Sequence, residues 1–276
     1  MSESTPRIEK EILEYYALIE EEDRLDIGDG PLEFARSLEL ISRYLSPPPG
    51  VILDVGGGPG RYSFWLADEG YEVHLIDPVA KHLERAKQRA RDRSEHPLAS
   101  VSIGDARDLP QGDSGCDGVL LLGPLYHLTD RADRLTALRE AYRVLQPGGL
   151  IFAAAISRFA SLVSGLVDGL IGDTYFAEIV EAVLANGQHH NPRNIPAYFT
   201  TAFFHHPAEL EAELRESGFR AIDVLPVEGP AWLTKDLASR MQDPEHRTQI
   251  LNLARAVENE PTLLGFTPHL MAIGRK

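Results

Sequence analysis

Between residues 51 and 156 the chain alternates short apolar runs with longer segments in which apolar residues recur every three or four positions. The first pattern is typical of buried strands, and the second of helices with one buried face. Strands are expected at 51–55, 71–77, 99–105, 116–123 and 150–156, and helices at 61–70, 79–93 and 131–145. Strands that alternate with helices predict a parallel sheet covered on both faces, which is a doubly wound α/β fold.

The flanking segments follow other patterns. Two helices are expected before this region, at 8–25 and 32–45, and the prolines at 47–49 separate them from the first strand. After residue 157 the alternation stops, and helical runs lead into an irregular stretch, 188–206, that is rich in aromatic residues and histidines. The expected elements after residue 157 are helices at 159–172 and 175–187, a helix at 207–219, a strand at 220–229, a helical stretch near 232–259 and a strand at 268–275.

These patterns divide the chain into four regions. We expect N-terminal helices at 1–46, a ligand-binding core at 47–156, a helical cap inserted at 157–206, and a return to the core sheet at 207–276. The two late strands bring the expected number to seven, so the prediction is a mostly parallel, seven-stranded, doubly wound sheet with a cap over one of its ends.

Composition and charge narrow the classes of function. A net charge of −15 repels polyphosphate backbones, so nucleic acid is not an expected partner. No stretch approaches the roughly 18 apolar residues of a membrane span, and the N-terminus lacks an apolar signal core. The only cysteine, Cys116, is consistent with a reducing compartment. We therefore expect a cytoplasmic protein, monomeric or homodimeric, that does not bind membranes.

The loop after the first expected strand, VILDVGGGPG at 51–60, is the most informative stretch. Its glycines allow the main chain to approach a ligand, and the next helix points free N–H groups into the same space. A phosphate-binding P-loop is excluded, because Arg61 stands where its second glycine belongs when counted from Gly56. The dinucleotide pattern G-x-G-x-x-G also meets Arg61 in place of its third glycine, so it remains only as an alternative.

A third pattern matches. Asp54-x-Gly56-x-Gly58-x-Gly60 resembles the first motif, D/E-x-G-x-G-x-G, of the class I S-adenosylmethionine (SAM) dependent methyltransferases. The stretches VHLIDP, IGDARDLP, CDGVLLLGPLYHL and LQPGG are also similar to landmarks of this family, and they occur in the same order. The resemblance covers residues 51–156.

The resemblance implies that SAM is the cofactor, that Asp77 holds both hydroxyls of its ribose, and that Asp105 meets its adenine amino group. Asp54 would fix the glycine loop or meet the ammonium group of SAM. From the residues alone, Asp77 can also cap the next helix, and Asp105 can be a turn residue. Tyr16 and Arg36 lie on the N-terminal helices that would close over the cofactor. The expected cofactor-binding residues are Asp54, Gly56, Gly57, Gly58, Gly60, Asp77, Pro78, Asp105, Ala106, Leu122, Gly123, Tyr16 and Arg36.

The loop GPLYHL after the fourth strand faces the transferred methyl group in this family, which makes Tyr126 and His127 the candidate catalytic residues. His127 would deprotonate an acceptor hydroxyl, or it would pack beside Tyr126, and the sequence leaves both roles open. In the cap, aromatic side chains are expected to wall an acceptor pocket, and we do not predict a metal site. The candidate acceptor-binding residues are His189, Tyr198, Phe204 and His205.

These expectations combine into a SAM-dependent methyltransferase that acts on a small molecule. The loop LGPLYHL departs from the [DNS]-P-P-[YFW] pattern of nucleic-acid amino methyltransferases, which favours a small acceptor. Two alternatives remain from the sequence, an NAD(P)-dependent oxidoreductase and a protein that binds SAM without turnover.

Overall fold

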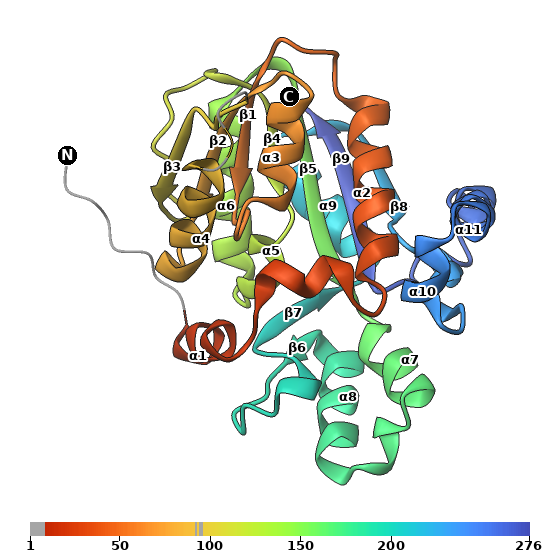
Figure 1. Ribbon diagram of the computed structural model, residues 1–276. Coiled ribbons are helices and arrows are strands. Elements are labelled where there is room, and N and C mark those ends of the chain that lie inside the picture. Colours follow the sequence, from red (N-terminus) through yellow and green to blue (C-terminus); the bar gives the residue numbers. More distant parts are fainter. Residues whose placement is uncertain (1–8, 92, 94–95) are drawn as a thin grey trace.

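In the computed structural model, which describes residues 9–91, 93 and 96–276, one sheet runs through the molecule with helices on both of its faces (Figure 1). Its strand order is β3-β2-β1-β4-β5-β9-β8, in which β9 runs antiparallel to both β5 and β8. The bounds are β1 Val51–Val55, β2 Glu72–Asp77, β3 Ser100–Ile103, β4 Cys116–Leu121, β5 Leu145–Ser157, β8 Arg220–Pro226 and β9 His269–Arg275. The predicted doubly wound, mostly parallel α/β fold is confirmed.

Two further strands join the sheet from the cap. The last residues of β5 pair in parallel with β7, Ala202–His205, which pairs in turn with β6, Gln188–His189. Ile156 of β5 is matched with both His269 of β9 and Phe204 of β7. Because β4 pairs with β5 only as far as Ala153, β7 can take the edge of β5 that β4 leaves open. Residues expected to be irregular therefore continue the sheet, and they anchor the cap at the end of β4.

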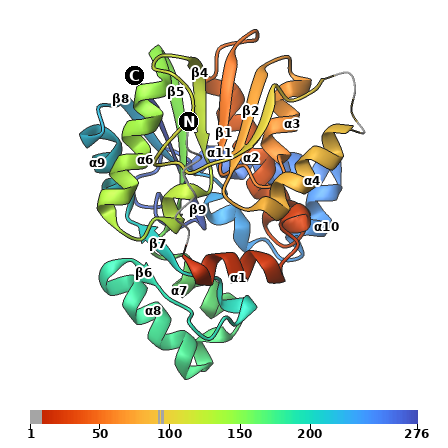
Figure 2. The ribbon, with the colours of Figure 1, turned by 90° about the vertical axis from the view of Figure 1, so that its left-hand side faces the viewer.

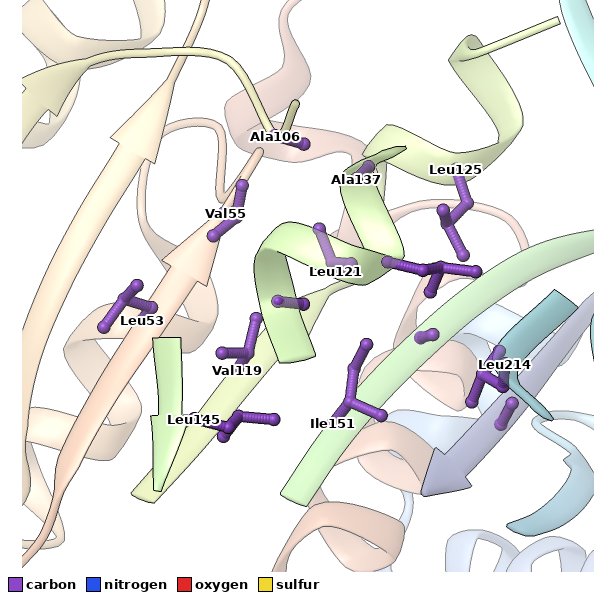
Figure 3. Close-up of a cluster of buried hydrophobic side chains, with 14 of the residues drawn as sticks. Leu53, Val55, Ala106, Val119, Leu121, Leu125, Ala137, Leu145, Ile151 and Leu214 are labelled. Atoms are coloured by element: carbon purple, nitrogen blue, oxygen red, sulfur yellow. The ribbon is translucent and has the colours of Figure 1, made fainter. Parts of the chain in front are cut away.

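The helices cover the sheet in two layers. Helices α6, Arg131–Val144, and α9, Pro207–Glu216, pack on one face, whose buried apolar side chains are shown in Figure 3. Helices α2, Gly30–Tyr44, and α3, Arg61–Asp68, pack on the other face. The remaining helices are α1 Lys10–Leu18, α4 Ala80–Arg91, α5 Pro124–His127, α7 Ala160–Val167, α8 Thr174–Asn186, α10 Leu237–Gln242 and α11 Pro244–Val257.

Helices α7 and α8 lie beyond one end of the sheet, and α1 lies beside them in both ribbon views (Figures 1 and 2). In the sequence α1 precedes the core at 51–156, and α7 and α8 follow it, yet they meet at the end of the sheet to which β5 leads. This arrangement encloses the region where ligands bind in parallel α/β sheets.

Several expected helices are divided in the structure. The helix expected at 8–25, whose residue 8 lies outside the described residues, ends at Leu18 and is followed by a 3₁₀ helix over Glu21–Asp26. Within that turn, Arg24 donates hydrogen bonds to Glu33 on α2, a contact that a sequence pattern does not reveal. The stretch near 232–259 divides at Asp243, whose side chain accepts hydrogen bonds from the first N–H groups of α11.

A buried ion pair joins α6 to α9. Nη2 of Arg134 lies 2.8 Å from Oε1 of Glu213, and both side chains are 2% exposed. Burial alone would raise the pKa of Glu213, but the hydrogen bonds from His205 and Arg134 lower it to about 2. The guanidinium also lies 3.8 Å from the centre of the Phe203 ring on β7. The pair therefore connects the core helices to the strand that anchors the cap.

Replacing Arg134 with methionine should lower the free energy of unfolding by about 3–5 kcal/mol, because the carboxylate of Glu213 would remain buried without its partner. Urea unfolding measures the change. Arg139→Met, on the exposed side of the same helix, is the matched control and should change stability by less than about 1 kcal/mol. Equal effects of the two substitutions would contradict this role of the buried pair.

Candidate functional site

The carboxyl ends of β1, β2 and β4 border a cavity, which we term the first cavity. Its walls come from the loops after these strands, from the loop after β3, and from the segment that follows α1. The expected cofactor residues that line it are Asp54, Gly56, Gly57, Gly58, Asp77, Pro78, Asp105, Ala106, Leu122, Gly123 and Tyr16.

The glycine loop needs small residues at two positions. Gly56 has φ of +70°, and a Cβ built there would lie 2.6 Å from Cγ of Pro124. A Cβ on Gly57 would lie 2.5 Å from Oδ2 of Asp54. Gly60 does not line the cavity; it precedes α3 in a left-handed conformation, so its role is to turn the chain into that helix.

Asp54 has one oxygen that holds the loop and one that remains unpaired. The residue is 1% exposed, and the Ser63 hydroxyl donates to its Oδ2 at 2.6 Å. Among the described residues, Oδ1 is buried without a hydrogen-bond partner. Burial raises the pKa of Asp54 to about 6, although the hydrogen bond from Ser63 acts to lower that pKa. A buried, unpaired acceptor on a cavity wall is the arrangement expected for a ligand with a cationic donor, such as the ammonium group of SAM.

Asp77 connects the loops after β1 and β2. The backbone N–H of Gly58 donates to its Oδ2 at 2.9 Å, and that of Val79 to its Oδ1 at 2.8 Å. Nδ1 of His82 lies 3.1 Å from Oδ1. The hydrogen bond from Val79 shows that Asp77 caps the start of α4, one of the two roles that the sequence left open. Asp77 also lies on the cavity wall, which is compatible with ribose binding.

Asp105 is paired within its own turn. The backbone N–H and Nε of Arg107 each donate to its Oδ1 at 2.9 Å, and Nη2 donates to its Oδ2 at 2.6 Å. Asp105 and Ala106 also line the first cavity. The turn-forming role of Asp105 is therefore present, and a role toward adenine remains a proposal.

The first cavity carries an excess of negative charge. Its described lining holds seven Asp and Glu residues and three arginines. Each arginine is held by carboxylates: Arg24 by Glu21 and Glu33, Arg61 by Asp26, and Arg107 by Asp105 and Asp133. A cationic ligand such as SAM fits this surface, whereas the two phosphates of a dinucleotide would face unfavourable carboxylates.

Tyr16 and His127 meet at the inner edge of this cavity. The Tyr16 hydroxyl lies 2.8 Å from Nε2 of His127, and Nδ1 of His127 lies 3.4 Å from the carbonyl oxygen of Thr201. Because a carbonyl only accepts, Nδ1 carries the proton and Nε2 accepts from Tyr16. Burial lowers the pKa of His127 to about 4, so its ring is neutral near pH 7.

A second cavity lies on the other side of Tyr16 and extends under the cap. It shares Tyr16, Glu21, Arg24 and Tyr126 with the first cavity. Its remaining wall includes six aromatic side chains, the expected residues Tyr198 and Phe204 together with Tyr15, Phe176, Phe199 and Trp232. A chamber with aromatic side chains in its wall, next to a cofactor cavity, is a suitable place for an organic acceptor.

Two of the histidines expected to bind the acceptor do not line either cavity. His189 is 1% exposed, stacks on Phe204 with ring centres 5.0 Å apart, and its Nδ1 lies 2.9 Å from the Thr200 carbonyl oxygen. His205 is fully buried, and its Nε2 lies 3.3 Å from Oε2 of Glu213. Both rings support the cap from within, because β6 and β7 turn them into its core.

Arg36 is also displaced from its expected role. Its side chain is fully buried, with Nε donating to the Val227 carbonyl at 3.1 Å and Nη2 to Glu258 at 2.6 Å. It does not line the first cavity. The prediction that Arg36 binds the cofactor is therefore corrected, since α2 turns this residue toward the C-terminal part of the chain.

The sequence reading missed residues that the fold brings to the cavities. His82 lines the first cavity, and Arg24 lines both. His82 carried a weak signal, because it lies beside Leu83 on the apolar side of an otherwise charged helix. Arg24 carried none, since it reaches the site through contacts between distant segments.

Glu33, Glu228 and His269 form a compact group at the wall of the second cavity, which Glu33 and His269 line, with one ligand-type atom of each within 4.8 Å of the others. Arg24 donates to both oxygens of Glu33, and Nδ1 of His269 lies 2.8 Å from Glu228. Burial alone would lower the pKa of His269, but the two glutamates outweigh it and raise it to about 9. These contacts make the group an ion-pair network in this structure.

Comparison with known proteins supports the class that the fold and cavity define. Residues 52–149 match a family model described as a methyltransferase domain. The chain is 37% identical to the ubiquinone/menaquinone biosynthesis C-methyltransferase UbiE of Acidiphilium cryptum, over 44% of this chain and 47% of that protein. It is 27% identical to the ubiquinone biosynthesis O-methyltransferase of Xanthomonas axonopodis pv. citri, over 80% of this chain and 81% of that protein.

A solved structure shows the same fold along nearly the whole chain. A SAM-dependent methyltransferase of Thermotoga maritima, described as a possible histamine N-methyltransferase, matches 96% of this chain and 98% of its own with a TM-score of 0.55 and 19% identity. The chain spans less than half the length of the first curated relatives that it matches.

These findings identify a methyltransferase domain at residues 52–149. Along nearly its whole length the chain has the fold of solved SAM-dependent methyltransferases. In the part of the chain that the structure describes, no helix has the length and apolarity that a membrane span requires.

The ion-pair network predicts a pH dependence of stability. Since folding raises the pKa of His269 from 6.5 to about 9, the folded protein binds more protons than the unfolded chain between these values. The contribution is complete below pH 6.5 and is lost as pH rises to 9, by an amount on the order of 3 kcal/mol. Urea unfolding should show a smaller loss between pH 6.5 and 9 in His269→Gln than in wild type. His246→Gln, an exposed histidine of α11, should behave as wild type, and identical slopes in all three proteins would contradict the network.

Proposed function

We propose that this protein transfers a methyl group from SAM, bound in the first cavity, to a small-molecule acceptor bound in the second cavity. The observation that carries the proposal is the wall common to both cavities, which is made of Tyr16, Glu21, Arg24 and Tyr126. Donor and acceptor would meet at this wall, and bringing two reactants together in one orientation is the main requirement of such a transfer.

The first cavity offers groups suited to SAM. Asp54 Oδ1 would bind the ammonium group, Asp77 Oδ2 a ribose hydroxyl, and the loop Gly56–Gly58 leaves room for the amino-acid part. When bound, SAM supplies a methyl group that is already activated on a sulfonium, so the protein needs no metal or electron carrier of its own.

The residues at the common wall would order the acceptor and exclude water. Tyr16, on α1, and Phe199, in the cap, both line the second cavity. Tyr126 stays protonated because burial raises its pKa. His127 is neutral, so its Nε2 would accept the proton of an acceptor hydroxyl once that hydroxyl takes the place of Tyr16.

A small acceptor is favoured by both the cavity and the relatives. The aromatic side chains of the second cavity lie under the cap. The net charge of the whole chain, −15, repels the backbone of a nucleic acid. The two curated relatives are named for ubiquinone or menaquinone biosynthesis, which supports an organic acceptor of low mass. We propose that the reaction takes place in the cytoplasm, as the single cysteine suggests.

The alternatives are less well supported. An oxidoreductase would need to hold dinucleotide phosphates against the acidic lining of the first cavity. A protein that binds SAM without turnover would have no use for a second cavity that shares a wall with the first. The second cavity therefore favours the enzyme.

Binding of the cofactor can be tested by calorimetric titration of S-adenosylhomocysteine and NADH. Wild type should bind S-adenosylhomocysteine and not NADH. The Asp77→Ala substitution should weaken the binding of S-adenosylhomocysteine at least tenfold, which is about 1.4 kcal/mol. The loss is expected because Asp77 both holds the Gly58 loop and faces the ligand. Uptake of NADH in place of S-adenosylhomocysteine would refute the proposed function.

The role of the second cavity can be tested by filling it. Ser164 of α7 lines this cavity, so Ser164→Trp should abolish methyl transfer to any acceptor that wild type methylates, with less than a twofold change in S-adenosylhomocysteine affinity. Transfer of the tritiated methyl group of SAM to a panel of phenols, quinols and amines provides the assay. Leu166→Trp, on the exposed side of the same helix, is the control and should retain activity. Full activity of Ser164→Trp would place the acceptor elsewhere.

A further inference from the structure

The carboxylate of Asp77 has fewer free positions than its expected role requires. An ionised carboxylate offers about four acceptor positions, two on each oxygen. On Oδ1, both are used by the N–H of Val79 at 2.8 Å and Nδ1 of His82 at 3.1 Å. On Oδ2, one is used by the N–H of Gly58 at 2.9 Å. One position remains, so Asp77 can bind one ribose hydroxyl but not both while these contacts persist.

His82 provides an unpaired polar atom in the same place. It lies in the first turn of α4, is 6% exposed, and lines the first cavity beside Asp77. Its Nε2 is buried and has no hydrogen-bond partner among the described residues. Leaving such an atom unpaired costs about 1–3 kcal/mol, which a ligand hydroxyl would recover.

The ring of His82 is held in one orientation. Its Nδ1 faces the carboxylate of Asp77, and the ring of Tyr16 packs edge-on at a centre distance of 5.2 Å and an angle of 87°. Since a carboxylate only accepts, Nδ1 carries the proton, and in the neutral ring Nε2 is an acceptor. An acceptor fixed in this way is suited to a hydroxyl donor, and the ring is positioned before any ligand arrives.

We propose that His82 is a cofactor-binding residue whose Nε2 accepts a hydrogen bond from one hydroxyl of the SAM ribose, while Asp77 Oδ2 accepts from the other. The inference rests on the proposed function, because it assumes that SAM occupies the first cavity. Two residues would therefore distinguish a ribose from a deoxyribose, because His82 and Asp77 would each bind one of its hydroxyls.

The test compares S-adenosylhomocysteine with its 2′-deoxy and 3′-deoxy analogues by calorimetry, in the absence of turnover. His82→Asn keeps an N–H group near the position of Nδ1 and removes the group at Nε2. His82→Gln places an amide near Nε2. His74→Asn, a β2 residue whose ring contacts Ser100 outside the cavity, is the matched control.

Wild type should bind S-adenosylhomocysteine about tenfold more tightly than the analogue that lacks the hydroxyl bound by His82. His82→Asn should bind S-adenosylhomocysteine about tenfold more weakly than wild type does. Its affinity for that analogue should equal the affinity of wild type. His82→Gln should recover part of the preference, and His74→Asn should keep all of it. Thermal unfolding without ligand shows whether each variant is folded.

The inference is overturned if folded His82→Asn binds S-adenosylhomocysteine with the wild-type affinity, or if its preference for the ribose form is unchanged. Failure of wild type to bind S-adenosylhomocysteine would instead overturn the proposed function, and the inference with it. The two failures are therefore distinguishable in a single set of titrations.

Discussion

The candidate site depends on the carboxylate of Asp77, which joins the loop after β1 to the segment that follows β2. It accepts hydrogen bonds from the loop after β1, from the start of α4, and from the side chain of His82. The carboxylate is 4% exposed, so these donors replace the water that it loses on burial. The shape of the first cavity follows from this convergence, because it fixes how far the glycine loop stands from α4.

The second cavity depends on charges in and around its walls that compensate one another. Arg24 and His269 neutralise Glu33 and Glu228, and Arg134 neutralises Glu213 below the cap. Aromatic side chains line the same cavity beside these pairs. The protein thus presents a chamber with aromatic side chains in its wall beside an acidic one, which matches an organic acceptor beside a cationic cofactor.

The sequence predicted the parts of this structure that depend on local pattern. The strands, the glycine loop, Asp54 and Asp77 follow from spacing within short stretches. The position that a side chain takes in the packed fold could not be predicted from local spacing. Arg36 was expected to face the cofactor, but the direction of α2 buries it against Glu258. The strand β7 was missed because its pairing depends on where β4 stops along β5, a property of three segments together.

Tyr16 belongs to the walls of both cavities, and it is held there by a hydrogen bond to His127. A ligand that shifts this side chain from one cavity changes the surface that the other cavity offers. Thermodynamic linkage requires such an effect to be reciprocal: whatever factor the acceptor applies to the affinity for SAM, SAM applies to the affinity for the acceptor. One tyrosine on the N-terminal helix is thus sufficient to make the two binding events report on each other.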